Sequence, residues 1–214
     1  MLPWLPRATW LTASAARDPV SDRPSDQPIE DAVRTILAEI GEDPDRSGLV
    51  DTPERVRRMY AELTAGYSMT PADVLNEAVF DVEYSEMVVV QDIPFHSLCE
   101  HHLLPFAGSA AVAYIPDRRV IGLSKIPRVV DMYARRLQIQ ERFTQQVADF
   151  LMEHLAPKGV GVVVEATHLC ASMRGVRKPG MVMTTSAVLG LFRRSDKTRA
   201  EFFSHLQRPS PGAP

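Results

Sequence analysis

Two short segments, far apart in the chain, combine thiols with imidazoles. Residues 99–102 read Cys-Glu-His-His, and residues 168–170 read His-Leu-Cys. Together they contain both cysteines of the 214-residue chain and three of its six histidines. Thiolate sulfur and imidazole nitrogen are ligands that Zn²⁺ prefers in proteins. These two segments therefore predict one metal centre, built from both.

The spacing within each segment separates ligands from free imidazoles. If the first segment forms a helical turn, Cys99 and His102 share a face at i and i+3, and His101 points elsewhere. If the second lies on a strand, His168 and Cys170 share a face at i and i+2. The predicted ligands are Cys99, His102 and Cys170, with His101 and His168 nearby. Three protein ligands and a position open for water are typical of a catalytic zinc site.

Two cysteines also permit other interpretations. A disulfide belongs to oxidising compartments, and nothing else in the sequence indicates secretion. Ordinary buried thiols are common in proteins. A structural zinc site normally closes with four protein ligands, and using His101 or His168 as the fourth would strain the spacing. Ligand chemistry and spacing favour the catalytic metal site over all three.

Basic residues accompany the predicted metal centre. The pair Ser124-Lys125 stands where a helix is expected to begin, and a helix N-terminus with a hydroxyl and a cation suits an anionic group. A lone arginine is usually solvated surface, but several cations around a metal site favour a polyphosphate substrate. The cations that favour this interpretation are Lys125, Arg128, Arg174, Arg177 and Lys178, with Arg55 and Arg58 as a further pair at i and i+3.

One acidic residue has two interpretations. Glu141, after Gln140, stands in the first turn of an expected helix, where a carboxylate usually complements the helix dipole. A carboxylate can also accept two hydrogen bonds from an N–H pair such as N1–H and the 2-amino group of guanine. The sequence alone leaves both interpretations open.

Composition limits the class of protein. The chain is 45% hydrophobic and 24% charged, which is ordinary for a globular protein with a real core. The net charge of −3 gives no basic field that would attract nucleic acid. Apolar stretches such as 160–164 are far too short to cross a bilayer. We therefore expect a cytoplasmic protein with no nucleic-acid or membrane partner.

The chain divides into four predicted parts. Residues 1–27 are expected to be a disordered leader, and the proline-rich residues 208–214 a disordered tail. Residues 28–78 form a small helical region, with a helix over 28–40, a second that begins at Thr52-Pro53 and a short third that begins at Thr70-Pro71. Residues 79–207 form the catalytic domain.

This last region mixes strands and helices, so the predicted fold class is α+β. Strands are expected over 87–93, 159–173 and 182–189, and a hairpin over 107–115 and 119–123 around Pro116-Asp117-Arg118. Helices are expected from Ser124 to about 136, over 140–154 and over 197–206. A sheet of this kind has open edges, which indicates oligomerisation.

These residues resemble GTP cyclohydrolase I, a zinc enzyme family, in segments that run in family order over about residues 28–206. The matching segments are 51–56 (DTPERV), 99–103 (CEHHL), 112–116 (VAYIP), 122–126 (GLSKI), 138–142 (QIQER), 165–170 (EATHLC), 173–176 (MRGV), 184–186 (TTS) and 190–192 (GLF).

The resemblance implies a tunnelling fold, in which antiparallel sheets from several subunits join into a barrel with helices outside. It also implies a homodecamer of two pentamers with active sites at subunit interfaces. The implied activity is zinc-dependent hydrolysis of GTP at C8, with formate release, an Amadori rearrangement and ring closure to 7,8-dihydroneopterin triphosphate, the first step of pterin and folate biosynthesis.

The family's residue roles carry over onto matching positions. The resemblance implies zinc ligation by Cys99, His102 and Cys170, and catalysis by His101 and His168 with Ser124 as a proton shuttle. Glu141, with Gln140 beside it, corresponds to the guanine anchor. The triphosphate and ribose contacts correspond to Ser124, Lys125, Arg128 and Arg174, and Arg55 and Arg58 match basic positions that reach the triphosphate from a neighbouring subunit.

Two alternatives remain open at this stage. A relative with the same fold reduces a deazaguanine nitrile with a nicotinamide cofactor, but that chemistry needs a nucleophilic cysteine, and both cysteines here stand at ligand positions. A non-catalytic, zinc-stabilised interaction module would not explain His101, His168 or Glu141.

Overall fold

The computed structural model describes residues 27–76 and 78–207. They form two compact units, the first ending at Arg58 and the second beginning at Met59. The predicted disordered leader, apart from Gln27, and the predicted disordered tail lie outside the described residues. The predicted division at 27/28, 78/79 and 207/208 stays a prediction.

The first unit contains α1 (Gln27–Glu39) and the beginning of α2 (Thr52–Leu63). Both helices were expected from the sequence. A partly buried ion pair joins them, because Nε of Arg57 donates to the Glu30 carboxylate at 2.9 Å. The apolar face of α1 includes the buried Val33 and Leu37, as its spacing of apolar residues predicts.

Short helices begin the second unit. After α2 come the 3₁₀ helix η2 (Ala65–Tyr67) and α3 (Pro71–Leu75). Thr70 caps α3 as predicted: its hydroxyl accepts from the Asp73 N–H at 3.3 Å, and the Asp73 carboxylate accepts from the Thr70 N–H at 2.8 Å. This reciprocal capping satisfies two backbone donors and fixes where the helix starts.

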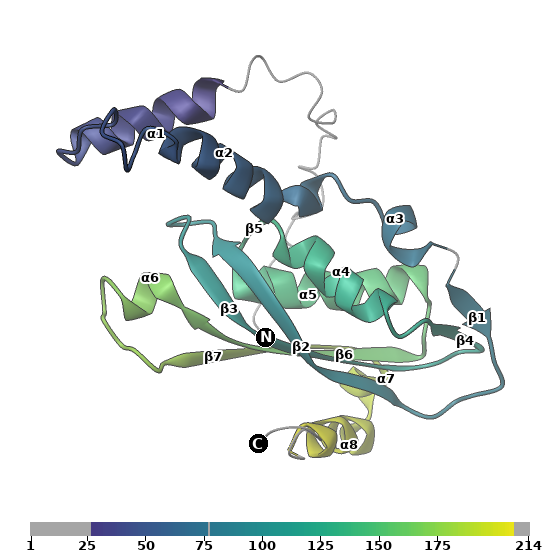
Figure 1. The fold of residues 1–214 in the computed structure, drawn as a ribbon. Coiled ribbons are helices and arrows are strands. Elements are labelled where there is room, and N and C mark those ends of the chain that lie inside the picture. Colours follow the sequence, from purple (N-terminus) through teal and green to yellow (C-terminus); the bar gives the residue numbers. More distant parts are fainter. Residues whose placement is uncertain (1–26, 77, 208–214) are drawn as a thin grey trace, which may run out of the picture. The chain divides into compact units, whose positions relative to one another are not determined.

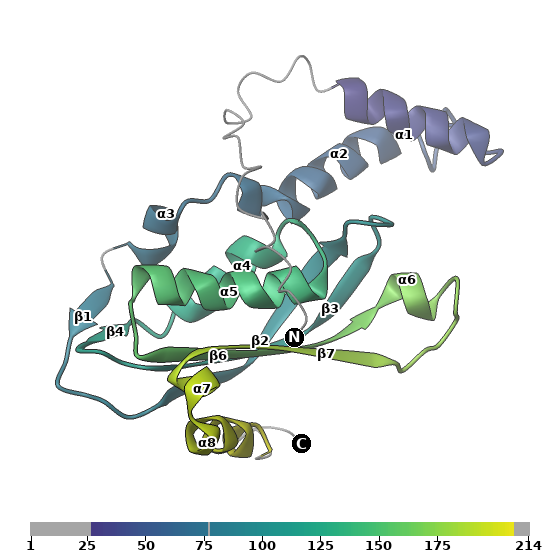
Figure 2. The same ribbon diagram turned by 180° about the vertical axis from the view of Figure 1, so that it is seen from behind.

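A five-stranded sheet, in the order β5-β2-β3-β6-β7, is the centre of this unit. Its four long strands pair with one another antiparallel, and the two-residue β5 pairs with β2 in parallel. The helices α4 and α5 cover one face of the sheet, while α7 and α8 lie on the other side (Figures 1 and 2). The bounds are β2 (Val88–Cys99), β3 (Pro105–Ile115), α4 (Lys125–Ala134), β5 (Leu137–Gln138), α5 (Gln140–His154), β6 (Gly159–His168), β7 (Val182–Gly190), α7 (Leu191–Arg194) and α8 (Asp196–Leu206).

The predicted hairpin between 107–115 and 119–123 is wrong. The strand β4 (Arg119–Ile121) pairs with β1 (Val79–Asp81) in a separate two-stranded sheet. The positive φ of 67° at Arg118 lets the backbone leave the β3 ladder after the turn. A side-chain hydrogen bond links the end of β4 back to β3, because the Tyr114 hydroxyl accepts from the Ile121 N–H at 3.3 Å.

The main core lies between the sheet and α4 and α5. Buried apolar residues on these helices meet the inward-facing residues of the long strands. Three phenylalanine rings are in contact there: Phe95 lies 5.9 Å from Phe106 and 4.8 Å from Phe143, measured between ring centroids. The prediction of an α+β fold with an antiparallel sheet and packed helices is confirmed. The oligomeric barrel stays a prediction.

No helix within 27–76 and 78–207 is both long enough and apolar enough to span a membrane.

Candidate metal centre

The three predicted ligands come together at one end of the sheet. Cys99 is the last residue of β2, His102 lies in the turn that leads to β3, and Cys170 lies on α6 (Leu169–Ser172) directly after β6. Their sulfur and ring-nitrogen atoms all lie within 4.8 Å of one another. The cluster can therefore hold a metal ion.

The local structure of both segments differs in part from the expectation. The first is a turn between strands rather than a helix, although the Leu103 N–H donates to the Cys99 carbonyl at 2.8 Å, as in one helical turn. The prediction of a strand through residues 168–170 is wrong. The last pair of the β3–β6 ladder is Phe106 with His168, because the chain before Pro105 turns away and leaves β6 without a partner. Cys170 therefore reaches the cluster from a helix.

The donor set fits a zinc ion. Ligand atoms on one tetrahedral Zn²⁺ lie about 3.3–3.8 Å apart, given Zn–S and Zn–N distances of about 2.3 and 2.0 Å. The observed limit exceeds the upper end of this range by about 1 Å. The His102 side chain is exposed, so no packed core prevents it from moving closer. Both cysteines are free thiols. Burial, and then the neighbouring Cys99, raise the pKa of the Cys170 thiol, and a bound cation would reverse this effect.

His168 is held on two sides. Its ring stacks on the buried Phe106, with 4.6 Å between centroids and 2° between planes. Its Nε2 lies 2.8 Å from Oε1 of Gln140, the first residue of α5. Burial lowers the pKa of the His168 imidazole below its ordinary value, and the nearby Glu141 carboxylate partly opposes this effect. The two contacts hold the ring in one orientation, and the lowered pKa favours the neutral imidazole.

His101 is in a different environment. Its side chain is 64% exposed, its Nδ1 lies 4.0 Å from the Cys99 sulfur and its Nε2 lies 4.0 Å from the Glu100 carboxylate. The same carboxylate forms an ion pair with Arg142 of α5, whose Nε also donates to Oε1 of Gln138 at 3.0 Å. This link joins the metal-site turn to the start of α5.

Sequence reasoning assigned no role to Glu100, Phe106 or Arg142. Arg142 and Gln138 are four residues apart across the start of α5, a spacing that could have suggested their contact. The stacking of Phe106 on His168 depends on the register between β3 and β6, which a single sequence does not specify.

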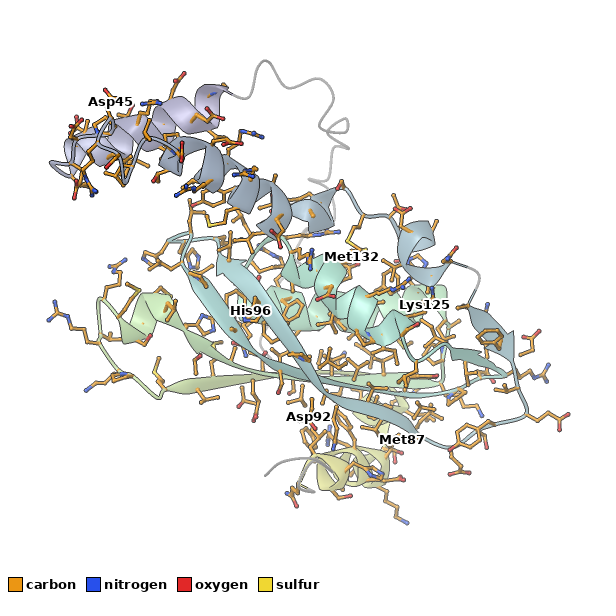
Figure 3. The ribbon with its side chains drawn as sticks, in the orientation of Figure 1. Asp45, Met87, Asp92, His96, Lys125 and Met132 are labelled. Carbon is orange, nitrogen blue, oxygen red and sulfur yellow. The ribbon has the colours of Figure 1, made fainter. Side chains whose placement is uncertain are left out.

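The other predicted site residues fall into three places. Glu141 and Arg174 lie near the cluster, since the Glu141 charge acts on His168 and the Arg174 charge acts on Cys170. The start of α4 lies at the opposite end of the sheet from α6 (Figures 1 and 2). It carries exposed Ser124 and Arg128 and Lys125, which is only 6% exposed and lies beside α3 (Figure 3).

Arg55 and Arg58 belong to the first unit. There they form exposed ion pairs along α2 and the turn before it, Arg55 with Asp51 at 3.0 Å and Arg58 with Glu54 at 3.3 Å. Exposed pairs at this spacing contribute little to stability, so both guanidinium groups can exchange these partners for a stronger anion.

Fold and site together define an α+β protein whose Cys99, His102 and Cys170 side chains can hold a metal ion. The family model described as GTP cyclohydrolase I matches residues 29–207. The chain belongs to the GTP cyclohydrolase I family.

Curated relatives agree with this assignment. A protein of Thermobifida fusca named GTP cyclohydrolase 1 is 64% identical over 179 residues, covering 82% of this chain and 86% of its own length. Proteins of the same name from Campylobacter jejuni and Deinococcus radiodurans are 58% and 57% identical, covering 82% and 88% of this chain and 93% and 87% of their own lengths.

A solved structure shows a more distant likeness. The apo form of an archaeosine synthase QueF-like protein aligns with a TM-score of 0.41 and 19% identity, over 49% of this chain and 93% of that chain. This similarity is too low to support any statement about activity.

Proposed function

We propose that this protein hydrolyses GTP at C8, releases formate and closes the rearranged product to 7,8-dihydroneopterin triphosphate. The family match over residues 29–207 supports the substrate. The single observation that carries the chemistry is the cluster of three ligand atoms within 4.8 Å, with His101 and His168 beside it.

We propose zinc as the resident metal, held by Cys99, His102 and Cys170. Two thiolates and one imidazole are a donor set suited to Zn²⁺, and three protein ligands are typical of catalytic sites. When bound, zinc supplies a Lewis acid that lowers the pKa of water and polarises the group under attack. Arg174 supports the thiolate form of Cys170, since its positive charge partly opposes the rise in the pKa of that thiol that burial and Cys99 cause.

The proton transfers fall to His168 and His101. Opening the C8–N bond leaves a ring nitrogen that must gain a proton, and an imidazole that has first taken a proton from the attacking water can deliver it. His168 is pre-positioned for this step by its contacts with Phe106 and Gln140. Ser124 is proposed as the proton shuttle in the later Amadori rearrangement.

Substrate binding is proposed to use both ends of GTP. The Glu141 carboxylate is exposed at the start of α5 and suits the paired N–H donors of guanine. The triphosphate is assigned to Ser124, Lys125, Arg128 and Arg174, with Arg55 and Arg58. This clamp positions GTP while leaving the phosphate bonds intact.

The distribution of these residues supports a homo-oligomer with shared sites. The start of α4 and the metal cluster lie at opposite ends of one sheet (Figures 1 and 2), so a second copy is needed to bring Lys125 to the cluster. The strand β7 forms an edge of the sheet, with no further strand paired to it in the part of the chain that the structure describes. An open edge of this length favours pairing with another chain. We propose a decamer of two pentamers, located in the reducing cytoplasm.

The test is to incubate the purified, zinc-loaded protein with GTP and to measure formate and the fluorescent oxidised neopterin. The proposal predicts equal amounts of both products. Formate without neopterin would remove the ring-closure step, and neither product would contradict the proposed function.

A further inference from the structure

The carboxamide of Gln140 is fully engaged inside the protein. The residue is only 1% exposed. Its Nε2 lies 2.8 Å from the Met183 carbonyl, 3.0 Å from the Val164 carbonyl and 3.2 Å from the Thr185 hydroxyl. Its Oε1 lies 2.8 Å from Nε2 of His168. One buried side chain therefore connects the start of α5 to β6, β7 and the catalytic histidine.

These contacts determine which way the amide points. The carbonyl oxygens of Met183 and Val164 can only accept hydrogen bonds, so they require the NH₂ group. The flipped amide would place Oε1 against two carbonyl oxygens, and it would leave buried acceptors without donors. The hydrogen-bond network therefore assigns Oε1 to the side of His168.

The amide orientation in turn determines the state of the histidine. Because Oε1 of Gln140 is an acceptor, Nε2 of His168 must carry a hydrogen. A neutral imidazole carries only one N–H, so Nδ1 is then the unprotonated nitrogen. The parallel stack on Phe106 holds the plane of the His168 ring. A half-turn of the ring about its Cβ–Cγ bond would keep this plane but break the 2.8 Å hydrogen bond to Gln140.

We propose that Gln140 is a positioning residue: its Oε1 holds the hydrogen of the His168 imidazole on Nε2, so that Nδ1 is the nitrogen left available to the substrate. The use of the His168 Nδ1 in the reaction rests on the proposed function. The proposal gives Gln140 a role through His168 rather than through guanine, because a side chain with 1% exposure and four internal partners has no surface left for a ligand.

The direct test is nitrogen NMR of the zinc-loaded, full-length protein with ¹⁵N-labelled histidine. His168 signals are assigned by their loss in His168→Ala, and spectra are taken about two pH units above the ordinary imidazole pKa of about 6.5. We expect a protonated Nε2 and an unprotonated Nδ1. An unprotonated Nε2 in the unsubstituted protein would overturn the proposal, whatever any variant does.

Gln140→Met tests the cause, because methionine has a similar length and no hydrogen-bonding amide. We expect His168 to lose its single-tautomer signature, and kcat for GTP to fall about 100-fold, the lower end of general acid–base contributions. KM should stay within about twofold, since uniform substrate binding is unchanged. A raised KM with unchanged kcat, or an unchanged tautomer, would overturn the proposal.

Two matched variants separate positioning from folding. Gln145→Met makes the same change on an exposed glutamine of α5, whose Nε2 donates to the Asp149 carboxylate at 2.8 Å. Both the His168 tautomer and kcat should stay as in the unsubstituted protein. Thr185→Val removes one partner of the Gln140 NH₂ group and leaves the His168 bond, so the tautomer should persist. Loss of the tautomer in Thr185→Val would overturn the specific role of Oε1.

The NMR result does not depend on turnover. If the unsubstituted protein failed to convert GTP while His168 showed a protonated Nε2 that Gln140→Met removed, the proposed function would fail and the positioning role would stand.

Discussion

At the scale of single residues, the two histidines beside the cluster differ in how far they are fixed. His168 is stacked on Phe106 and hydrogen-bonded to Gln140, whereas the His101 side chain is 64% exposed and its ring nitrogens lie 4.0 Å from the Cys99 sulfur and the Glu100 carboxylate. A proton donor works best when it is held in position before the substrate arrives. This difference favours His168 as the group that protonates the opening ring.

His168→Ala should therefore keep the metal and lose turnover. The ligand atoms of Cys99, His102 and Cys170 do not include His168, so zinc content should be unchanged. Formate release should fall about 10²- to 10⁴-fold, the usual contribution of a positioned acid or base. Zinc analysis and a formate assay on the same preparation check both expectations.

The control is His154→Ala, which removes an imidazole at the other end of α5, where the ring packs on Phe150. Its turnover should match that of the unsubstituted protein. Undiminished turnover in His168→Ala would refute the acid–base role.

At the scale of elements, pairing between β3 and β6 positions His168. The register places Phe106 opposite His168 and, two residues further on, Gly108 opposite Ala166. A Cβ at Gly108 would lie 1.8 Å from the Glu165 backbone carbonyl. Only glycine allows the two strands to approach this closely. Gly108 therefore helps to keep the β3–β6 register that places Phe106 opposite His168.

Gly108→Ala should lower stability and disturb the site. Overpacking of this kind costs about 1–3 kcal/mol in unfolding free energy, which for a chain of this length lowers Tm by about 2–4 °C per kcal/mol. Gly122→Ala is the matched control, because its Cβ would meet nothing closer than 3.5 Å. Thermal unfolding of both variants measures the difference; equal Tm values would show that the β3–β6 pairing yields without cost.

Predictions from the sequence succeeded where the signal was local. Cys99 and His102 are three residues apart and share a turn, so their meeting followed from spacing, and the helix over 140–154 followed from its apolar periodicity. The partner of β4 and the end of β6 depend on strands far away in the sequence. No single-sequence pattern encodes those choices, because the energy that decides them comes from tertiary packing.

At the scale of the whole molecule, the proposed site draws on groups that one chain keeps apart. The metal cluster and the start of α4 lie at opposite ends of the sheet (Figures 1 and 2). The proposal of shared active sites therefore predicts that defects in different subunits complement one another.

Subunits with Cys170→Ala and subunits with Lys125→Met should each be inactive alone. If one subunit supplies the metal ligands and another supplies Lys125, random mixed oligomers should recover about a quarter of the unsubstituted activity. Co-expression with two affinity tags isolates oligomers that contain both chains. Absence of activity in such oligomers would contradict shared sites.

The most direct measurement of the central claim counts zinc and formate together. We expect the unsubstituted protein to hold about one zinc ion per subunit, in a site with three protein ligands, and to release formate from GTP. Cys170→Ala should lose both the metal and the formate. A Cys170→Ala protein with full zinc content and full formate release would contradict the assignment of Cys99, His102 and Cys170 as the catalytic metal centre.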